Sequence, residues 1–164
     1  MKISCLQENL AKGLSIVGRA VSTRSTLPVL ANVLLSTDNG RLKLSATNLE
    51  IVITCWVGAK VEEEGAITVP ARTLNDLVST LPQEQVHLAL NEKTQTLHVS
   101  CARTEANIKG IDAQEFPLVP EPDRNHRIRV EADVFKQMIN QVAFAAAIDD
   151  TRPTLTGVST RFDD

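Results

Sequence analysis

The chain has 164 residues, of which 43% are hydrophobic, so it can bury a core and is not a disordered tail. Its net charge of −3 excludes a chain that is basic overall, although a local basic face on an acidic body stays open. No signal-peptide h-region and no apolar run of about 20 residues occur. We therefore expect a cytoplasmic protein, without a membrane partner, of one domain or slightly more.

The cysteines and histidines are scattered along the chain. Cys5, Cys55 and Cys101 are odd in number, widely spaced and outside any CxxC motif, which indicates small buried hydrophobes rather than disulfides or metal ligands. No cluster of His, Cys and Asp has the spacing of a metal site. The sequence therefore predicts no metal and no cofactor.

The first sixty residues predict one helix and then strands. A capping box formed by Ser4 and Gln7 precedes the helix, which is expected over residues 8–22. Its apolar residues recur at spacings of 4, 3 and 4, as on one face of a helix: Leu10, Leu14, Val17 and Val21. Strands are expected over 29–36, 41–46 and 51–57, and the turn Asp38-Asn39-Gly40 joins the first two.

The pattern continues with a second helix and more strands. A short strand over residues 66–69 leads into a helix over 71–80, which Pro82 ends. Three alternating segments then predict strands over residues 86–90, 97–101 and 105–111. Residues 117–127 hold three prolines and no periodicity, which is typical of a linker.

The segment after the linker resembles the beginning of the chain. A shift of 125 positions pairs Leu14 with Ile139 and Pro28 with Pro153, which predicts a second copy of strand, helix, polar turn and strand. We expect its helix to bury an apolar stripe: Phe135, Met138, Ile139, Val142 and Ala146. The organisation is then a first domain over 1–120, a linker over 121–127 and an incomplete second domain over 128–164. The natural protein is expected to be longer.

Five segments in this order resemble the bacterial DNA polymerase sliding clamp, the beta subunit of DNA polymerase III. They are residues 24–32 (RSTLPVLAN), 46–50 (ATNLE), 68–72 (TVPAR), 116–117 (FP) and 152–158 (RPTLTGV). Each motif is short, but their order and the repeat together are specific, and the match spans nearly the whole chain.

The resemblance implies an α+β DNA clamp fold, with antiparallel sheets outside and two helices per domain on the inner face. A family subunit has three such domains, and two subunits form a homodimer ring around double-stranded DNA without sequence specificity. The ring is a processivity factor that tethers the replicative polymerase and is placed by a clamp loader. It has no catalysis of its own, although such subunits are catalogued with DNA-directed DNA polymerase.

The resemblance also implies site residues. It assigns DNA contact to Arg24, Arg72, Asp149, Pro153 and Thr154. The outward face of the first helix adds Lys12 and Arg19, because basic side chains facing phosphates bind DNA without reading sequence. The implied subunit interface comprises Thr73, Leu77, Leu81, Arg103 and Ile108. Part of the groove that binds polymerase peptides is assigned to Arg152 and Leu155.

Simpler interpretations remain open beside these. The cations are also typical of a solvated helix face, and Arg72 can pair with Asp76 at i,i+4. A metal-dependent nuclease would need clustered carboxylates, and a single-strand binder would need aromatic platforms, of which this chain has few. The alternative function is a truncated, non-encircling DNA- or protein-binding module.

Overall fold

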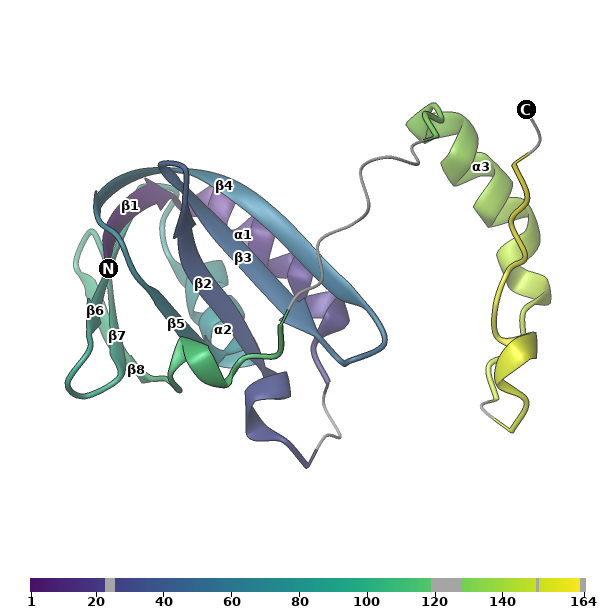
Figure 1. Ribbon diagram of the computed structural model, residues 1–164. Helices are drawn as coiled ribbons and strands as arrows, with labels where there is room; N and C mark the ends of the chain where they lie inside the picture. The colour runs from purple at the N-terminus through teal and green to yellow at the C-terminus, as the bar shows by residue number, and fades with distance from the viewer. Residues whose placement is uncertain (23–25, 119–127, 150, 163–164) are drawn as a thin grey trace. The chain divides into compact units, whose positions relative to one another are not determined.

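The computed structural model describes residues 1–22, 26–118, 128–149 and 151–162 (Figure 1). The chain divides into two compact units, Met1–Pro120 and Glu121–Asp164. Arg24 and the expected linker over 121–127 lie outside the described residues. Within the described part of the chain, no helix is long and apolar enough to cross a bilayer.

The described residues of the first unit form eight strands and two α-helices, in the order β-α-β-β-β repeated twice (Figure 1). The first half comprises β1 (Lys2–Leu6), α1 (Gln7–Val17), β2 (Asn32–Asp38), β3 (Arg41–Thr47) and β4 (Val52–Glu63). The second half comprises β5 (Ala66–Pro70), α2 (Ala71–Thr80), β6 (Gln85–Asn91), β7 (Thr96–Cys101) and β8 (Thr104–Lys109). Short 3-10 turns follow α1 (η1, Gly18–Ala20), precede β2 (η2, Pro28–Ala31) and follow β8 (η3, Ala113–Glu115).

All eight strands form one antiparallel sheet in the order β5-β2-β3-β4-β1-β6-β7-β8. An isolated bridge joins β5 to the chain after β8, because Thr68 and Ile111 exchange backbone hydrogen bonds of 3.0 and 2.9 Å. Gly110 permits this approach, since a Cβ there would lie 2.5 Å from the Thr68 carbonyl oxygen. The sheet therefore almost closes on itself, and the expected α+β fold is confirmed.

The predicted stripe of the first helix is the centre of the core. Leu10, Leu14 and Val17 are almost wholly buried, and α1 packs on β3 and β4. Gly13 lies on the same face, where a Cβ would stand 2.8 Å from Val57 Cγ2 and 2.9 Å from Leu44 Cδ1. The absence of a side chain at position 13 thus allows the helix to approach the sheet closely.

The β2–β3 turn forms as the sequence predicts. Asn39 and Gly40 have φ values of 49° and 74°, the positive angles that a two-residue hairpin turn requires. In β3 the buried Leu42 and Leu44 alternate with the outward Arg41 and Lys43. The prediction of a strand over residues 29–36 is wrong in its first part, because η2 precedes β2 and Pro28 starts that turn.

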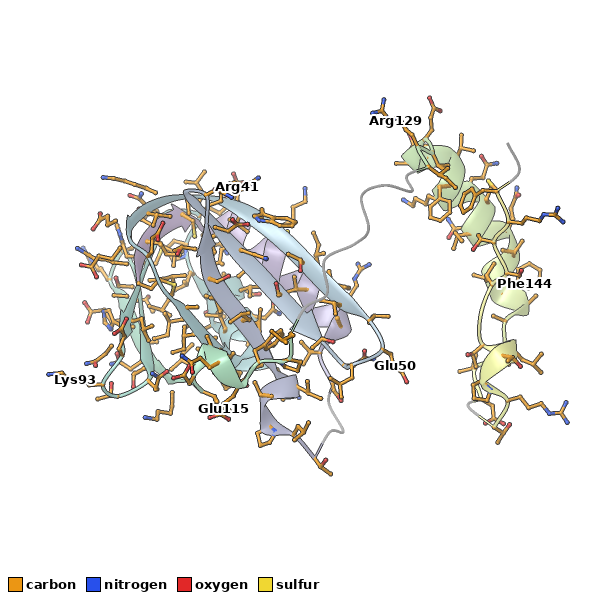
Figure 2. All side chains as sticks on the ribbon, viewed as in Figure 1. Arg41, Glu50, Lys93, Glu115, Arg129 and Phe144 are labelled. Atoms are coloured by element: carbon orange, nitrogen blue, oxygen red, sulfur yellow. The ribbon has the colours of Figure 1, made fainter. Side chains whose placement is uncertain are left out.

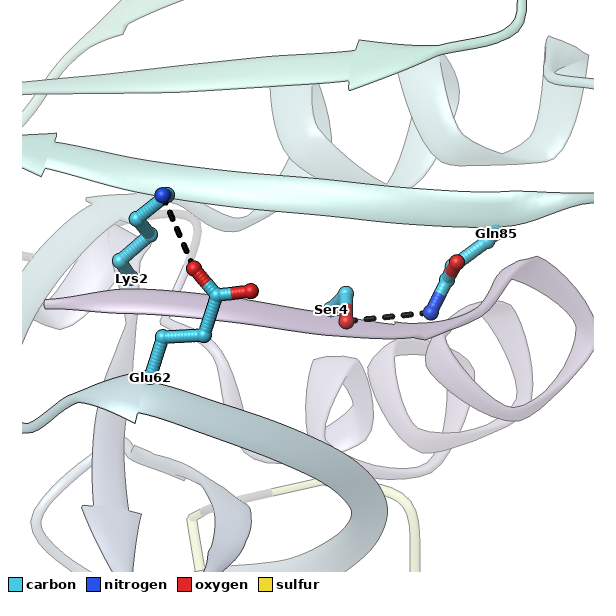
Figure 3. Close-up of polar contacts among 4 residues, drawn as sticks. All are labelled: Lys2, Ser4, Glu62 and Gln85. Carbon is cyan, nitrogen blue, oxygen red and sulfur yellow. Dashed lines mark hydrogen bonds and ion pairs between the residues drawn. The ribbon is translucent and has the colours of Figure 1, made fainter.

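The capping box at Ser4 and Gln7 is also wrong. Ser4 lies within β1, where its Oγ accepts a 3.1 Å hydrogen bond from Gln85 Nε2 (Figure 3). Gln7 begins α1, and its Nε2 donates to the Val78 carbonyl oxygen at 2.8 Å. The pattern misleads because the helix follows the strand directly, so both side chains contact distant segments instead of the helix end.

The cysteine prediction is confirmed for two of the three residues. Cys5 and Cys101 are buried and Cys55 is half-buried, and all three are free thiols. Burial raises the pKa of the Cys5 thiol to about 12, so this side chain stays protonated and behaves as a small apolar group.

The second unit repeats the beginning of the first. Under the shift of 125 positions, α1 and η1 fall on α3 (Ala132–Val142) and η4 (Ala143–Ala145), and η2 falls on η5 (Pro153–Leu155). Three backbone hydrogen bonds of the first unit have counterparts 125 positions later in the second. The bond from Val21 N to Gly18 O corresponds to that from Ala146 N to Ala143 O, the bond from Ser22 N to Leu30 O to that from Ala147 N to Leu155 O, and the bond from Leu30 N to Leu27 O to that from Leu155 N to Arg152 O. The predicted repeat is therefore confirmed for the helix and the turns.

The burial predicted for the second helix is wrong. No residue of α3 is buried, and Phe135, Met138 and Val142 are 40%, 54% and 45% exposed. Ile139 and Ala146 are only half-buried, and Phe144 beyond the helix is 85% exposed (Figure 2). The expected flanking strands are also absent from residues 128–149 and 151–162. An amphipathic helix buries its stripe only against another element, and the described second unit supplies no sheet for it.

Candidate nucleic-acid interface

The two helices of the first unit lie side by side on one face of its sheet (Figure 1). α1 packs on β3 and β4, and α2 packs on β2 and β5. Between the helices is an open depression of about 420 Å³. Its lining residues come from both helices and the turn after α1: Leu14, Ser15, Gly18, Arg19, Val21, Ala71, Arg72 and Asn75.

Two of the predicted DNA-contact residues meet at this depression. Arg19 lies in η1 and Arg72 is the second residue of α2, and each points away from the buried side of its helix. The sequence predicts each arginine separately and gives no reason to place them together. Their proximity follows from the packing of α1 against α2.

The alternative interpretation of Arg72 is also visible. Its Nε lies 3.7 Å from Asp76 Oδ2 in the expected i,i+4 arrangement. The two side chains are 95% and 67% exposed, so water screens the pair and its contribution is only a few tenths of a kcal/mol. Such a weak pair leaves the guanidinium available to a stronger anion such as phosphate.

Lys12 does not belong to this depression. It lines a separate hollow of about 310 Å³ between α1 and β4, together with Ile16 and Gly58. The helix face as a whole exposes three cations and two acids: Lys12, Arg19, Arg72, Glu8 and Asp76. The face is therefore weakly basic on a chain that is acidic overall.

Two polar residues of the depression were not assigned as site residues from the sequence. Ser15 lies four residues before Arg19, and Asn75 lies three residues after Arg72. These spacings place each on the same helix face as its arginine. A search for polar residues at i−4 and i+3 from the two arginines would have found them.

The carboxylate of Asp149 in the second unit accepts hydrogen bonds within its own turn. Its Oδ1 accepts a 3.0 Å hydrogen bond from Thr151 N, and its Oδ2 accepts one of 2.9 Å from Thr151 Oγ1. The backbone hydrogen bond, and then that of the hydroxyl, hold the pKa of Asp149 below its usual value. An ionised carboxylate repels phosphate, so the cations of the first unit are the stronger candidates.

The remaining candidates of the second unit surround η5. Pro153, Thr154 and Arg152 are exposed, and Leu155 is 52% exposed. The backbone of Leu155 is tied to Ala147 by a 2.9 Å hydrogen bond, which fixes the turn. Both assignments, DNA contact and polymerase groove, stay predictions.

The predicted subunit-interface residues differ in the surface they offer. Thr73 on α2 and Arg103 in the β7–β8 turn are exposed. Leu77 is half-buried, and Leu81 and Ile108 are only 7% and 6% exposed because they complete the core. A partner would thus contact mainly the first two, together with the edge strand β8.

Within the described ranges, no three His, Cys, Asp or Glu side chains are arranged to hold a metal ion. His87 and His98 lie on neighbouring strands, and the Nδ1 of His98 is hydrogen bonded to Asn107 Oδ1 at 3.0 Å. His126 lies outside the described residues.

Comparison with solved structures defines the class of protein. The fold matches a DNA polymerase III beta subunit from Eubacterium rectale with a TM-score of 0.90 and 30% identity, over 96% of this chain and 43% of that one. It matches a DNA polymerase sliding clamp from Caulobacter crescentus with a TM-score of 0.88 and 32% identity, over the same shares. The fold is that of a sliding clamp.

Sequence comparison gives the family. Residues 1–120 match the profile of the DNA polymerase III beta subunit, N-terminal domain. The chain is 41% identical over 161 residues to the beta sliding clamp of Synechococcus elongatus, and 29% identical over 167 residues to that of Bacillus subtilis. These matches cover 96% and 97% of this chain, but only 42% and 44% of the relatives. The chain belongs to the DNA polymerase III beta subunit family.

Proposed function

We propose that this chain acts as part of a ring-shaped sliding clamp, which encircles duplex DNA and tethers the replicative polymerase. The observation that carries the proposal is the pair of arginines, Arg19 and Arg72, which two separate helices bring to one depression in a chain of this family. The proposed role is that of a processivity factor with no chemistry of its own.

The charge of the helix face suits sliding. Duplex DNA carries about one negative charge per ~1.7 Å of its axis, so even a few cations attract it. Contacts to phosphates carry no sequence information, which allows movement along any sequence. Because enclosure in a ring replaces affinity, an acidic chain with a weakly basic inner face is compatible with the role.

The proposed residue roles rest partly on position and partly on the family resemblance. Arg19 and Arg72 contact phosphates from the depression, Lys12 adds a cation on the flank of α1, and Arg24 is assigned by resemblance alone. The homodimer contact uses Thr73 and Arg103, with the edges of Leu77, Leu81 and Ile108. In the complete protein, Arg152 and Leu155 contribute to the polymerase groove. Replicative polymerase and clamp loader are the proposed partners, in the cytoplasm.

The first test is the intact mass of the native protein from its own cells. A mass more than twice the 17.9 kDa of this chain would support a ring of repeated domains. A mass equal to that of this chain would refute encirclement and favour the non-encircling module.

The arginine assignment has its own test. We expect Arg19→Ala with Arg72→Ala to weaken binding of duplex DNA, and to reduce its salt slope by roughly 0.9 per lost phosphate contact. Lys93→Ala is the matched control, because Lys93 is an exposed cation in the β6–β7 turn (Figure 2). An unchanged slope in the double variant, measured by fluorescence anisotropy of labelled duplex, contradicts the assignment.

A further inference from the structure

The outward face of the β2–β3–β4 sheet carries an aromatic side chain between two cations. Trp56 on β4 lies across from Lys43 on β3 in the strand register, and Arg41 is two residues away on the same face. The Arg41 Cζ and the Lys43 Nζ each lie 5.7 Å from the centre of the indole ring. We name these three residues the Trp56 cluster; the label of Arg41 marks its position in Figure 2.

The indole of the cluster is oriented by its neighbours. Trp56 Nε1 donates a 2.7 Å hydrogen bond to Asp38 Oδ2, and Asn39 Nδ2 donates one of 2.7 Å to Asp38 Oδ1. Asp38 belongs to the hairpin turn, whose geometry is fixed by Asn39 and Gly40. A surface that is already ordered loses little entropy when a partner binds.

The positive charges of the cluster are only partly compensated by neighbouring described residues. Among the described residues, neither Arg41 nor Lys43 forms an ion pair, whereas Lys2 pairs with Glu62 and Arg72 with Asp76. Asp38 lies across from Arg41 in the register and offsets one of the two positive charges, although both of its carboxylate oxygens accept hydrogen bonds from Trp56 and Asn39. An excess of one positive charge therefore remains here on an acidic protein, beside an indole that is 45% exposed.

We propose that the Trp56 cluster is a docking site for an acidic peptide segment of a partner protein. Carboxylates of the segment pair with Arg41 and Lys43, and its apolar atoms cover the exposed edge of Trp56. Charge complementarity favours this occupant, and Trp and Arg are the residue types that dominate binding energy at protein interfaces. Both cations lie over the ring, which leaves less of its face for a stacked nucleobase and disfavours single-stranded nucleic acid.

The site is separate from the depression between α1 and α2, although Trp56 also lines the hollow that contains Lys12. Leu42 and Leu44 of β3 are buried on the side covered by α1, and Arg41 and Lys43 alternate with them toward the opposite side. The docking site and the depression between α1 and α2 therefore lie on opposite faces of the sheet. Loss of one is not expected to affect the other.

The experiment uses the single tryptophan of the chain as its reporter. A dye-labelled hexaglutamate peptide is titrated at low salt, with its anisotropy giving the affinity and Trp56 emission giving the location. We expect binding that shifts the emission and weakens in about 0.5 M salt, where charges are screened within ~4–5 Å. The double variant Arg41→Glu, Lys43→Glu should weaken binding by about tenfold or more, because two attractive ion pairs are replaced by like-charge repulsion.

The matched control reverses the same number of charges elsewhere. Lys93 lies in the β6–β7 turn and Lys109 on β8. The double variant Lys93→Glu, Lys109→Glu should keep the affinity for hexaglutamate within about twofold of that of the parent. If the charge-reversed variant fails to fold by circular dichroism, Arg41→Gln with Lys43→Gln replaces it. No emission change, equal loss in the control, or tighter binding of an oligothymidylate than of hexaglutamate would each overturn the proposal.

Discussion

The helices α1 and α3 have equal lengths and equivalent positions in the repeat, but opposite environments. α1 buries Leu10, Leu14 and Val17 against the sheet, whereas no residue of α3 is buried. Both sequences are amphipathic, so the pattern specifies the helix in each case. Burial depends on strands that come from elsewhere in the chain, and the first unit alone has them among the described residues.

The largest expected effect is on the free energy of unfolding, and it should differ between equivalent positions of the two helices. Leu10 and Phe135 are related by the shift of 125, and their side chains are 0% and 40% exposed. Leu10→Ala should lower the free energy of unfolding by about 2–5 kcal/mol, because it leaves a cavity in the core. Phe135→Ala should change it by less than about 1 kcal/mol. Urea unfolding followed by circular dichroism, to which the helices of both units contribute, measures both, and similar losses would invalidate the comparison.

A second prediction concerns the approach of α1 to the sheet. Gly13→Ala introduces a Cβ 2.8 Å from Val57 Cγ2, so the core must shift at a cost of about 1–3 kcal/mol. The better helix propensity of Ala offsets about 1 kcal/mol of this. Gly18→Ala is the control, since nothing lies within 4 Å of its Cβ. In the same unfolding assay, Gly13→Ala should have a lower free energy of unfolding than both the parent and the control.

The two methionines allow a smaller, chemical comparison of the units. Met1 is 4% exposed in the first unit, and Met138 on α3 is 54% exposed. Dilute peroxide should therefore oxidise Met138 well before Met1, because access to the sulfur limits the rate. Peptide mass spectrometry gives the order, and equal rates would show that the two sites are equally accessible.

The smallest expected effect is on the pKa of one carboxylate in each unit, and through it on the pH dependence of stability. The Glu62 pKa is lowered by the hydrogen bond and charge of Lys2 at 2.9 Å (Figure 3), and the Asp149 pKa by hydrogen bonds from Thr151. Both lowered pKa values contribute stability above the unfolded pKa, which is lost as pH falls through the folded one.

Salt concentration distinguishes a pKa lowered by a neighbouring cation, as at Glu62, from one lowered by neutral hydrogen-bond donors, as at Asp149. Raising it should return the Glu62 pKa toward its usual value, because a cation is screened, and should move the Asp149 pKa less. Carboxyl NMR titration at low and high salt is the measurement. An equal response of the two groups would contradict the different causes.

Local patterns predicted much of the fold, and the failures involve distant contacts. The limits of α2 and the turn at Asn39-Gly40 follow from periodicity and from backbone preferences of single residues. Ser4 failed as a cap because Gln85, 81 residues away, hydrogen bonds to it. Arg19 and Arg72 line the same depression because α1 packs against α2, and the spacing of residues along the sequence does not predict that packing.

The bridge between Thr68 and Ile111 also has a consequence for solubility. Open strand edges are templates for pairing with other chains, and the bridge covers part of the β5 edge, while β8 keeps the edge proposed for the partner subunit. Because Gly110 leaves no room for a side chain at the Thr68 carbonyl, a larger residue there would disturb the bridge and uncover that part of β5. A folded protein with such a change would offer a second edge to other chains, so this one glycine limits unwanted pairing as well as completing the fold.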